Sequence, residues 1–170
     1  MATPSLVLLG LLALLAQAGC AWAAPRTLAV FDFELIDTSL EGATNGPRAD
    51  EAARLASTSD RLRRRLTESG EFALVDMAAI AAEAHGSNLQ ACGGCDAALA
   101  RRAGAELAIT GTVQKVSNLI LNMSIYIREA DTGHRIAAMT ADMRGNTDES
   151  WSRTLDWLVR NRLLAPGGLQ

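Results

Sequence analysis

The chain has 170 residues, with 16 basic and 19 acidic side chains and a formal net charge of -3. Nucleic-acid-binding domains usually present a basic face, so this balance argues against a nucleic-acid partner. Without its first 23 residues the chain has the length of a single domain. A domain of that size buries about two-thirds of its unfolded surface, so it needs neither a metal nor a disulfide merely to fold.

The N-terminus has the pattern of an export signal. Residues 5–18, SLVLLGLLALLAQA, carry no charge and are mostly Leu and Ala. This stretch is shorter than the roughly 20 apolar residues that span a bilayer. Ala21-Trp22-Ala23 fits the small-x-small rule of signal peptidase. We therefore predict a signal peptide over 1–23 that is cleaved near Ala23, one domain over 24–165 and a C-terminal tail over 166–170.

Two alternatives remain for this segment. Cys20 would carry a lipid anchor if the preceding residues were a lipobox, although Gln17 stands where a lipobox normally has Leu. A retained apolar helix is the other alternative. For the mature chain that follows signal cleavage we predict no transmembrane span.

The first half of the domain predicts alternating strands and helices. Residues 27–35, TLAVFDFEL, are apolar and rich in β-formers, which is typical of a buried strand. Residues 36–50 contain Gly, Asn and Pro and predict a loop. Apolar side chains between 52 and 66 are spaced by three and four residues, and Gly70 ends this predicted helix. The next elements are a strand over 71–76, helices over 77–84 and 95–105, and a strand over 106–116.

The second half contains the clearest pattern in the chain. Apolar and polar residues alternate over 119–129, which predicts a half-buried strand. ADTGH (130–134) has turn chemistry, and residues 135–143 return as the second strand of a hairpin. Asn146 is predicted to cap the last helix, with Glu149 three residues later completing a capping box.

These elements follow the order β-α-β-α-α-β-β-β-α. An early crossover and a late antiparallel hairpin predict an α/β fold: a single-domain sandwich in which helices pack on a mixed sheet.

Cys92 and Cys95 are the only cysteines after residue 23, and an even number in an exported protein favours a disulfide. A redox dithiol is an alternative, because a helix start lowers a thiol pKa. A metal site is a second alternative, although only His85 and His134 would complete it. We predict a structural disulfide and no resident metal.

Several other residues are candidates for ligand or partner contacts. Asp32, Glu34 and Asp37 lie at or just after the end of a predicted strand, where open α/β sheets bind ligands. Tyr126 lies on the polar face of the hairpin, a position suited to a partner surface. The start of the last helix adds three more candidates: Asp148, Glu149 and Trp151.

The chain resembles a bacterial exported family of uncharacterised domains. The resemblance rests on AVFDFEL, GAELAITGTVQKVSN, the C-x-G-C pair, KVSNLILN and RGNTDESW, and it covers residues 27–164. At the level of the fold the chain is similar to the N-terminal domain of the Tol-system periplasmic protein and to the periplasmic domain of the curli secretion pore. This resemblance implies a periplasmic location and a role in binding or assembly.

We therefore expect a non-enzymatic periplasmic accessory or binding domain without a cofactor, whose partner is another periplasmic or envelope protein. The chain contains no G-x-S-x-G, P-loop, H-E-x-x-H or dinucleotide fingerprint. The resemblance also implies a supporting role beside quinoprotein (PQQ) alcohol oxidation. The alternatives are a thiol–disulfide redox protein that uses Cys92 and Cys95, and a metal-handling accessory protein.

Overall fold

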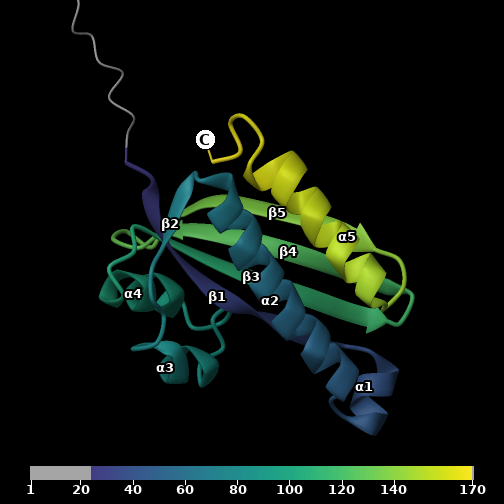
Figure 1. Cartoon of the computed structure of the whole chain (residues 1–170). Coiled ribbons are helices and arrows are strands. Elements are labelled where there is room, and N and C mark those ends of the chain that lie inside the picture. Colours follow the sequence, from purple (N-terminus) through teal and green to yellow (C-terminus); the bar gives the residue numbers. More distant parts are fainter. Residues whose placement is uncertain (1–23, 170) are drawn as a thin grey trace, which may run out of the picture.

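A long first strand organises the sheet. The computed structural model describes residues 24–169, and the predicted signal peptide lies outside them. Strand β1 (Arg26–Asp37) pairs in parallel with β2 (Phe72–Leu74) on one side and with β3 (Leu107–Ser117) on the other. β4 (Ile120–Glu129) and β5 (Arg135–Met143) continue the sheet in antiparallel fashion. The order is β2-β1-β3-β4-β5 (Figure 1).

The helices form two groups (Figure 1). The two longest cross one face of the sheet, and their apolar stripes pack on the strands. A second group packs near β1 and the start of β3 through a smaller apolar cluster. The helices are α1 (Leu40–Asn45), α2 (Ala49–Ser69), α3 (Ala81–His85), α4 (Cys95–Arg102), α5 (Asp148–Leu158) and the π-helical turn η1 (Val159–Leu163).

Side-chain alternation along the strands explains the main core. Ile109 in β3 and Ile125 in β4 point to the face covered by α2 and α5, and both are 0% exposed. Leu66 of α2 and Leu155 of α5 meet them there and are also 0% exposed. This layer of helix on sheet confirms the predicted α/β fold with a mixed sheet and a late hairpin.

Four local predictions differ from the structure. The helix predicted over 77–84 begins only at Ala81, after a turn. Residues 36–50 were expected to form a loop, but β1 continues to Asp37 and Ser39 caps α1. The strand predicted over 71–76 pairs over only three residues. The prediction that Asn146 caps the last helix is wrong. Thr147 is the cap, and its side chain accepts a hydrogen bond from the Ser150 N–H.

Candidate functional site

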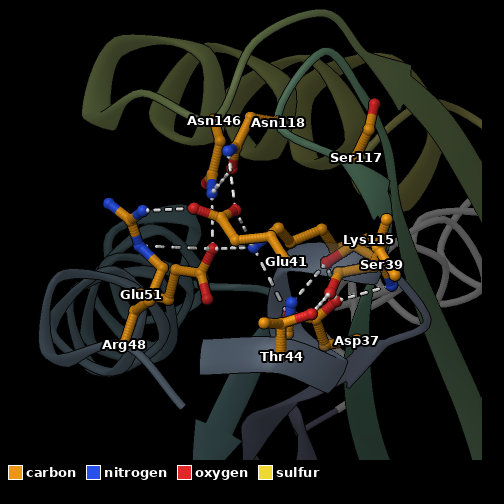
Figure 2. A network of polar contacts seen from close by, with 12 residues as sticks. Asp37, Ser39, Glu41, Thr44, Arg48, Glu51, Lys115, Ser117, Asn118 and Asn146 are labelled. Atoms are coloured by element: carbon orange, nitrogen blue, oxygen red, sulfur yellow. Dashed lines mark hydrogen bonds and ion pairs between the residues drawn. The ribbon is translucent and has the colours of Figure 1, made fainter. Parts of the chain in front are cut away.

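Lys115 lies at the far end of β3 and is 0% exposed. Its ammonium group contacts carboxylates from three other elements (Figure 2). The Nζ atom is 2.7 Å from Glu51 Oε1 in α2, 3.1 Å from Glu41 Oε2 in α1 and 3.3 Å from Asp37 Oδ2 in β1. One side chain therefore joins four elements, and we call this group the Lys115 network.

Burial and pairing act in opposite directions on this lysine. Burial alone would lower the pKa of Lys115, but hydrogen bonds with Glu51, Glu41 and Asp37 outweigh it and raise the pKa to about 12. Hydrogen bonds from Lys115 and Asn118 hold the pKa of Glu41 below its ordinary value. Burial would raise the pKa of Asp37, but hydrogen bonds from Ser39 and Lys115 hold it low. The network is therefore stable as an ionic cluster at neutral pH.

Two asparagines extend the Lys115 network to the turn between β3 and β4. Asn118 Nδ2 donates to Glu41 Oε2 at 2.7 Å, and Asn146 Nδ2 donates to Glu51 Oε1 at 2.6 Å. The Asn146 backbone N–H donates to Asn118 O at 2.9 Å. Figure 2 shows these two asparagines side by side, next to Glu41. They fix the β3–β4 turn to the helices on either side of the network.

Trp151 secures the second asparagine. Its indole Nε1–H donates to Asn146 Oδ1 at 2.9 Å, and the side chain is 2% exposed. This use of the Asn146 side chain explains why Thr147, rather than Asn146, caps α5. Trp151 therefore lies in the core beside the network and not on the surface.

An apolar surface lies at the same end of the sheet. Of the six large apolar side chains that are markedly exposed in residues 24–169, five belong to the end of β1, the start of α1 and the β3–β4 turn; the sixth is Trp157 on α5. Backbone pairing brings these segments together, because Thr38 N–H donates to Lys115 O and Ser117 pairs with Ile120. We call these five residues the apolar end: Ile36 (41% exposed), Leu40 (84%), Val116 (50%), Leu119 (75%) and Ile120 (61%).

A groove of about 640 Å³ runs along β1 and ends beside this surface. Its walls are residues 30–36 of β1, Arg63 of α2, parts of α3 and the loop over 86–91. We call it the β1 groove. Ile36 belongs to both the groove and the apolar end, so the two surfaces are continuous.

Two of the predicted acidic candidates lie in the β1 groove. Asp32 Oδ1 accepts a hydrogen bond from Arg63 at 2.5 Å, and Asp32 Oδ2 is 3.5 Å from His85 Nε2. Glu34 Oε1 accepts the Leu89 N–H at 3.0 Å and so holds the loop wall against β1. Asp37, by contrast, belongs to the Lys115 network.

The cysteine pair lies next to this wall. The sulfur atoms of Cys92 and Cys95 are at disulfide distance, and their Cα atoms are 5.6 Å apart. Gly93 and Gly94 have φ angles of 69° and 110°, which favour glycine in this short loop. The Cys95 N–H, at the start of α4, points to Cys92 Sγ at 3.2 Å.

The remaining candidates lie elsewhere on the surface. Tyr126 is partly buried, with the Arg135 guanidinium 5.9 Å from its ring centroid. Asp148 pairs with Arg54 at 2.7 Å, and Glu149 pairs with Arg153. The three acids near β1 and the two acids of α5 therefore do not form one site.

Sequence reasoning missed the centre of the Lys115 network. Glu51 and Asn118 had no assigned contact, Asn146 was assigned a helix cap, and Glu41 was considered only as a possible cation-binding acid beside Asp37. Lys115 stood out only as the single lysine of the chain. Its position within a strand predicted from apolar residues was a usable signal, because a buried lysine requires carboxylate partners.

Residues 24–169 contain neither a candidate metal site nor a candidate membrane-spanning helix. Over 24–169, no group of three or more His, Cys, Asp or Glu side chains is arranged to hold a metal ion. In the same part of the chain, no helix combines the length and apolar character needed to cross a membrane.

The fold defines a small α/β domain with a five-stranded mixed sheet. The chain belongs to the DUF3280 family, described as "protein of unknown function (DUF2380)", which matches residues 26–163. No curated protein matches the chain in sequence. This family confirms the expected resemblance to a family of uncharacterised domains. The quoted motifs and the likeness to the Tol-system and curli domains stay predictions.

Solved structures share the fold. The LpoB C-terminal domain from Salmonella enterica has a TM-score of 0.50 and 18% identity, covering 74% of this chain and 87% of that one. Hypothetical protein CT253 from Chlamydia trachomatis has a TM-score of 0.50 and 14% identity, covering 81% and 95%. Lipoprotein GNA1162 from Neisseria meningitidis has a TM-score of 0.49 and 17% identity, covering 83% and 98%. At these identities the likeness to the LpoB domain and to CT253 shows the fold alone.

Replacing Lys115 by Met tests the network. At pH 7 the variant removes Lys115 from three carboxylates, of which Glu51 is fully buried, and breaking such a buried pair costs about 3–5 kcal/mol in the free energy of unfolding. Asp37 and Glu41 have lowered pKa values in the fold, so their stabilisation is present above the ordinary carboxyl pKa of about 4 and is lost as the pH falls through the lowered values. The difference between wild type and variant should therefore shrink below about pH 4.

Urea unfolding between pH 2.5 and 9 measures this difference. Lys115 stays protonated over this whole range, because the stabilisation linked to its own titration is lost only as the pH rises through about 12. The expected pH dependence therefore comes from the carboxylates. Arg64→Met is the matched control, because Arg64 is an exposed base of α2, and it should change stability by about 0.5 kcal/mol or less. A loss for Lys115→Met that is equally small, or that does not depend on pH, would contradict the ionic account.

Proposed function

We propose that the chain is a non-enzymatic accessory domain, exported to the periplasm, that binds another envelope or periplasmic protein through the apolar end. One observation carries this proposal: five of the six exposed large apolar side chains gather at one end of the sheet. Clustered apolar surface is typical of interaction sites, whereas scattered exposed side chains need no explanation.

The Lys115 network supports a binding role for the apolar end. The network fixes the β3–β4 turn through Asn118, so Leu119 and Ile120 stay exposed on a rigid support. A surface that is ordered before binding loses less conformational entropy when a partner docks. The arrangement therefore favours tight binding by a few apolar side chains.

The surroundings favour a protein over an anionic membrane surface as the partner. Membrane-binding apolar surfaces are usually rimmed by Lys and Arg. Lys115, beneath the turn, is fully buried, and Arg48, which is 41% exposed, is paired with Glu41 and Asp50. Arg144, which follows the β5 residue paired with Leu121, is a single exposed base there rather than a basic rim. The partner proteins that the resemblance implies include components of quinoprotein (PQQ) alcohol oxidation, and we include them in the proposal.

Photo-crosslinking in the native host tests this function. A crosslinking residue in place of Leu119 should give a discrete product, from which the partner is identified by mass spectrometry. The purified partner should then bind wild-type protein, and Leu119→Ser and Ile120→Ser should each weaken the dissociation constant at least tenfold, because each loses an apolar anchor.

Trp157→Ser is the matched control. Trp157 is the sixth exposed large apolar side chain, is 41% exposed and lies on α5 away from the apolar end. It should bind the partner as wild type does. Equal affinity for all three variants, or no crosslinked partner at all, would overturn the proposal.

A redox role for Cys92 and Cys95 is the second candidate, and one contact favours it. The Cys95 N–H at the start of α4 points to Cys92 Sγ, and in a reduced pair this contact would stabilise a thiolate. The binding account instead treats the bond as structural, because it joins the end of the 86–91 loop, which forms one wall of the β1 groove, to the start of α4.

The reduction potential of the pair separates these two roles. Protein exported to a periplasm is equilibrated across a glutathione series, and free thiols are alkylated and counted by mass. We expect a potential below about -300 mV, the range of structural disulfides. A value between about -120 and -200 mV lies in the range of disulfide oxidoreductases and would favour the redox role.

A further inference from the structure

The outer side of β1 has a short neighbour. β2 pairs only with Arg26–Leu28, and the last contact is the Val75 N–H donating to Leu28 O. The chain then turns away toward α3. Within residues 24–169 no strand pairs with the outer edge of β1 beyond Leu28. Figure 1 shows β1 continuing along the margin of the sheet well past β2.

The backbone of this edge points outward at Leu35. Thr38 N–H donates to Lys115 O, so residue 38 faces β3. Because successive residues of a strand alternate, residues 36 and 34 also face β3, and Leu35 presents its N–H and C=O to the outer edge. The same alternation explains why the Phe33 N–H points outward, where it donates to Ser59 Oγ at 2.9 Å.

The groups nearest β2 are already capped by α2. Ser59 accepts the Phe33 N–H, and Arg63 donates to Val30 O at 3.2 Å. In the described part of the chain, no hydrogen bond outside the sheet involves the Leu35 N–H or C=O. Leu35 is therefore the position where an incoming backbone would find free groups.

The shape of the β1 groove favours an extended chain. Every residue from 30 to 36 lines it, whichever face its side chain takes, so the groove follows the strand edge itself. At about 3.3 Å per residue this is about 20 Å long. An extended chain can pair with the free backbone groups of such an edge at the usual strand spacing of about 4.8 Å. A helix cannot, because it bonds its own N–H and C=O groups internally.

The charge of the groove favours a segment of another protein over β1 of a second copy as its occupant. Asp32 and Glu34 line the groove, but Asp32 is paired with Arg63, so Glu34 is the acid there without an ion-pair partner among residues 24–169. Pairing β1 with β1 of another copy would add further acidic side chains beside Glu34, which destabilises a sheet. A segment with Lys or Arg facing Glu34 would be attracted instead.

We propose that the β1 groove binds an extended segment of the partner protein, which adds to the sheet as a strand beside β1. The segment would bond through its backbone to Leu35, place alternate apolar side chains in the groove and set a Lys or Arg near Glu34. This inference rests on the proposed function, because Ile36 joins the groove to the apolar end. It adds that the partner contributes an extended segment to the groove.

Two variants of Leu35 isolate the backbone contact. Leu35→Pro removes the outward N–H without breaking a bond to β3, and proline is tolerated where a strand N–H faces away from its neighbour. Leu35→Ala shortens the side chain but keeps the N–H, so it is the matched control. If Leu35→Pro does not fold, Gln90→Trp, which fills the groove from its exposed opposite wall, is expected to give the same loss of binding.

The probes are two ten-residue peptides that alternate Val with polar residues. One carries two Lys among the polar positions and the other carries two Glu. Nuclear magnetic resonance titration of labelled full domain should show the Lys peptide shifting the amide signals of residues 33–36 and 84–90. The Glu peptide should bind at least tenfold more weakly, and Leu35→Pro should bind the Lys peptide at least tenfold more weakly than Leu35→Ala.

Three results would overturn the inference: no shifts in the groove with either peptide, equal affinities for Leu35→Pro and Leu35→Ala, or a concentration-dependent dimer that shifts the same amides. The partner crosslinked at Leu119 distinguishes this failure from failure of the proposed function. If that partner binds Leu35→Pro as tightly as Leu35→Ala, the groove inference fails and the apolar end stands. If Leu119 gives no partner, the proposed function fails.

Discussion

One buried cation holds together the end of the sheet that carries the apolar end. Lys115 is fully enclosed, and a buried ammonium group is stable only when carboxylates and hydrogen bonds compensate its lost hydration. The compensation comes from β1, α1 and α2 at once. Because Glu41 and Glu51 also bind Asn118 and Asn146, the position of the β3–β4 turn depends on the same cluster. The exposed apolar side chains of that turn are thus supported by an ionic interior.

The β1 groove is a second surface, and it exists because β2 is short. β2 is too short to cover β1, so α2 caps only Val30 and Phe33 and leaves Leu35 free. The loop over 86–91 and α3 then form the far wall of the β1 groove. Both surfaces meet at Ile36, and we propose that one partner contacts both. The stretches KVSNLILN and RGNTDESW, far apart in sequence, meet in the Lys115 network through Asn118 and Asn146.

The predictable part of the structure is the part governed by local periodicity. Alternation over 119–129 gave the hairpin, and three- and four-residue spacing gave α2 and α5, because these patterns reflect one buried face. Helix α1 was missed because its short sequence contains Gly and Asn, and its start depends on the Ser39 cap. The acidic candidates were divided between the groove and the network because their partners, Arg63 and Lys115, come from distant segments. Long-range pairing of this kind leaves no periodic signal.

Amide hydrogen exchange tests most directly whether the Lys115 network holds the turn. The Asn146 N–H, which donates to Asn118 O, reports on the turn, and the buried Ile125 N–H reports on the middle of the sheet. In Lys115→Met, protection of Asn146 should fall at least tenfold relative to Ile125, because local opening of the turn becomes easier than opening of the sheet. An unchanged ratio of the two protection factors would show that the turn is held without the buried lysine and would contradict the account.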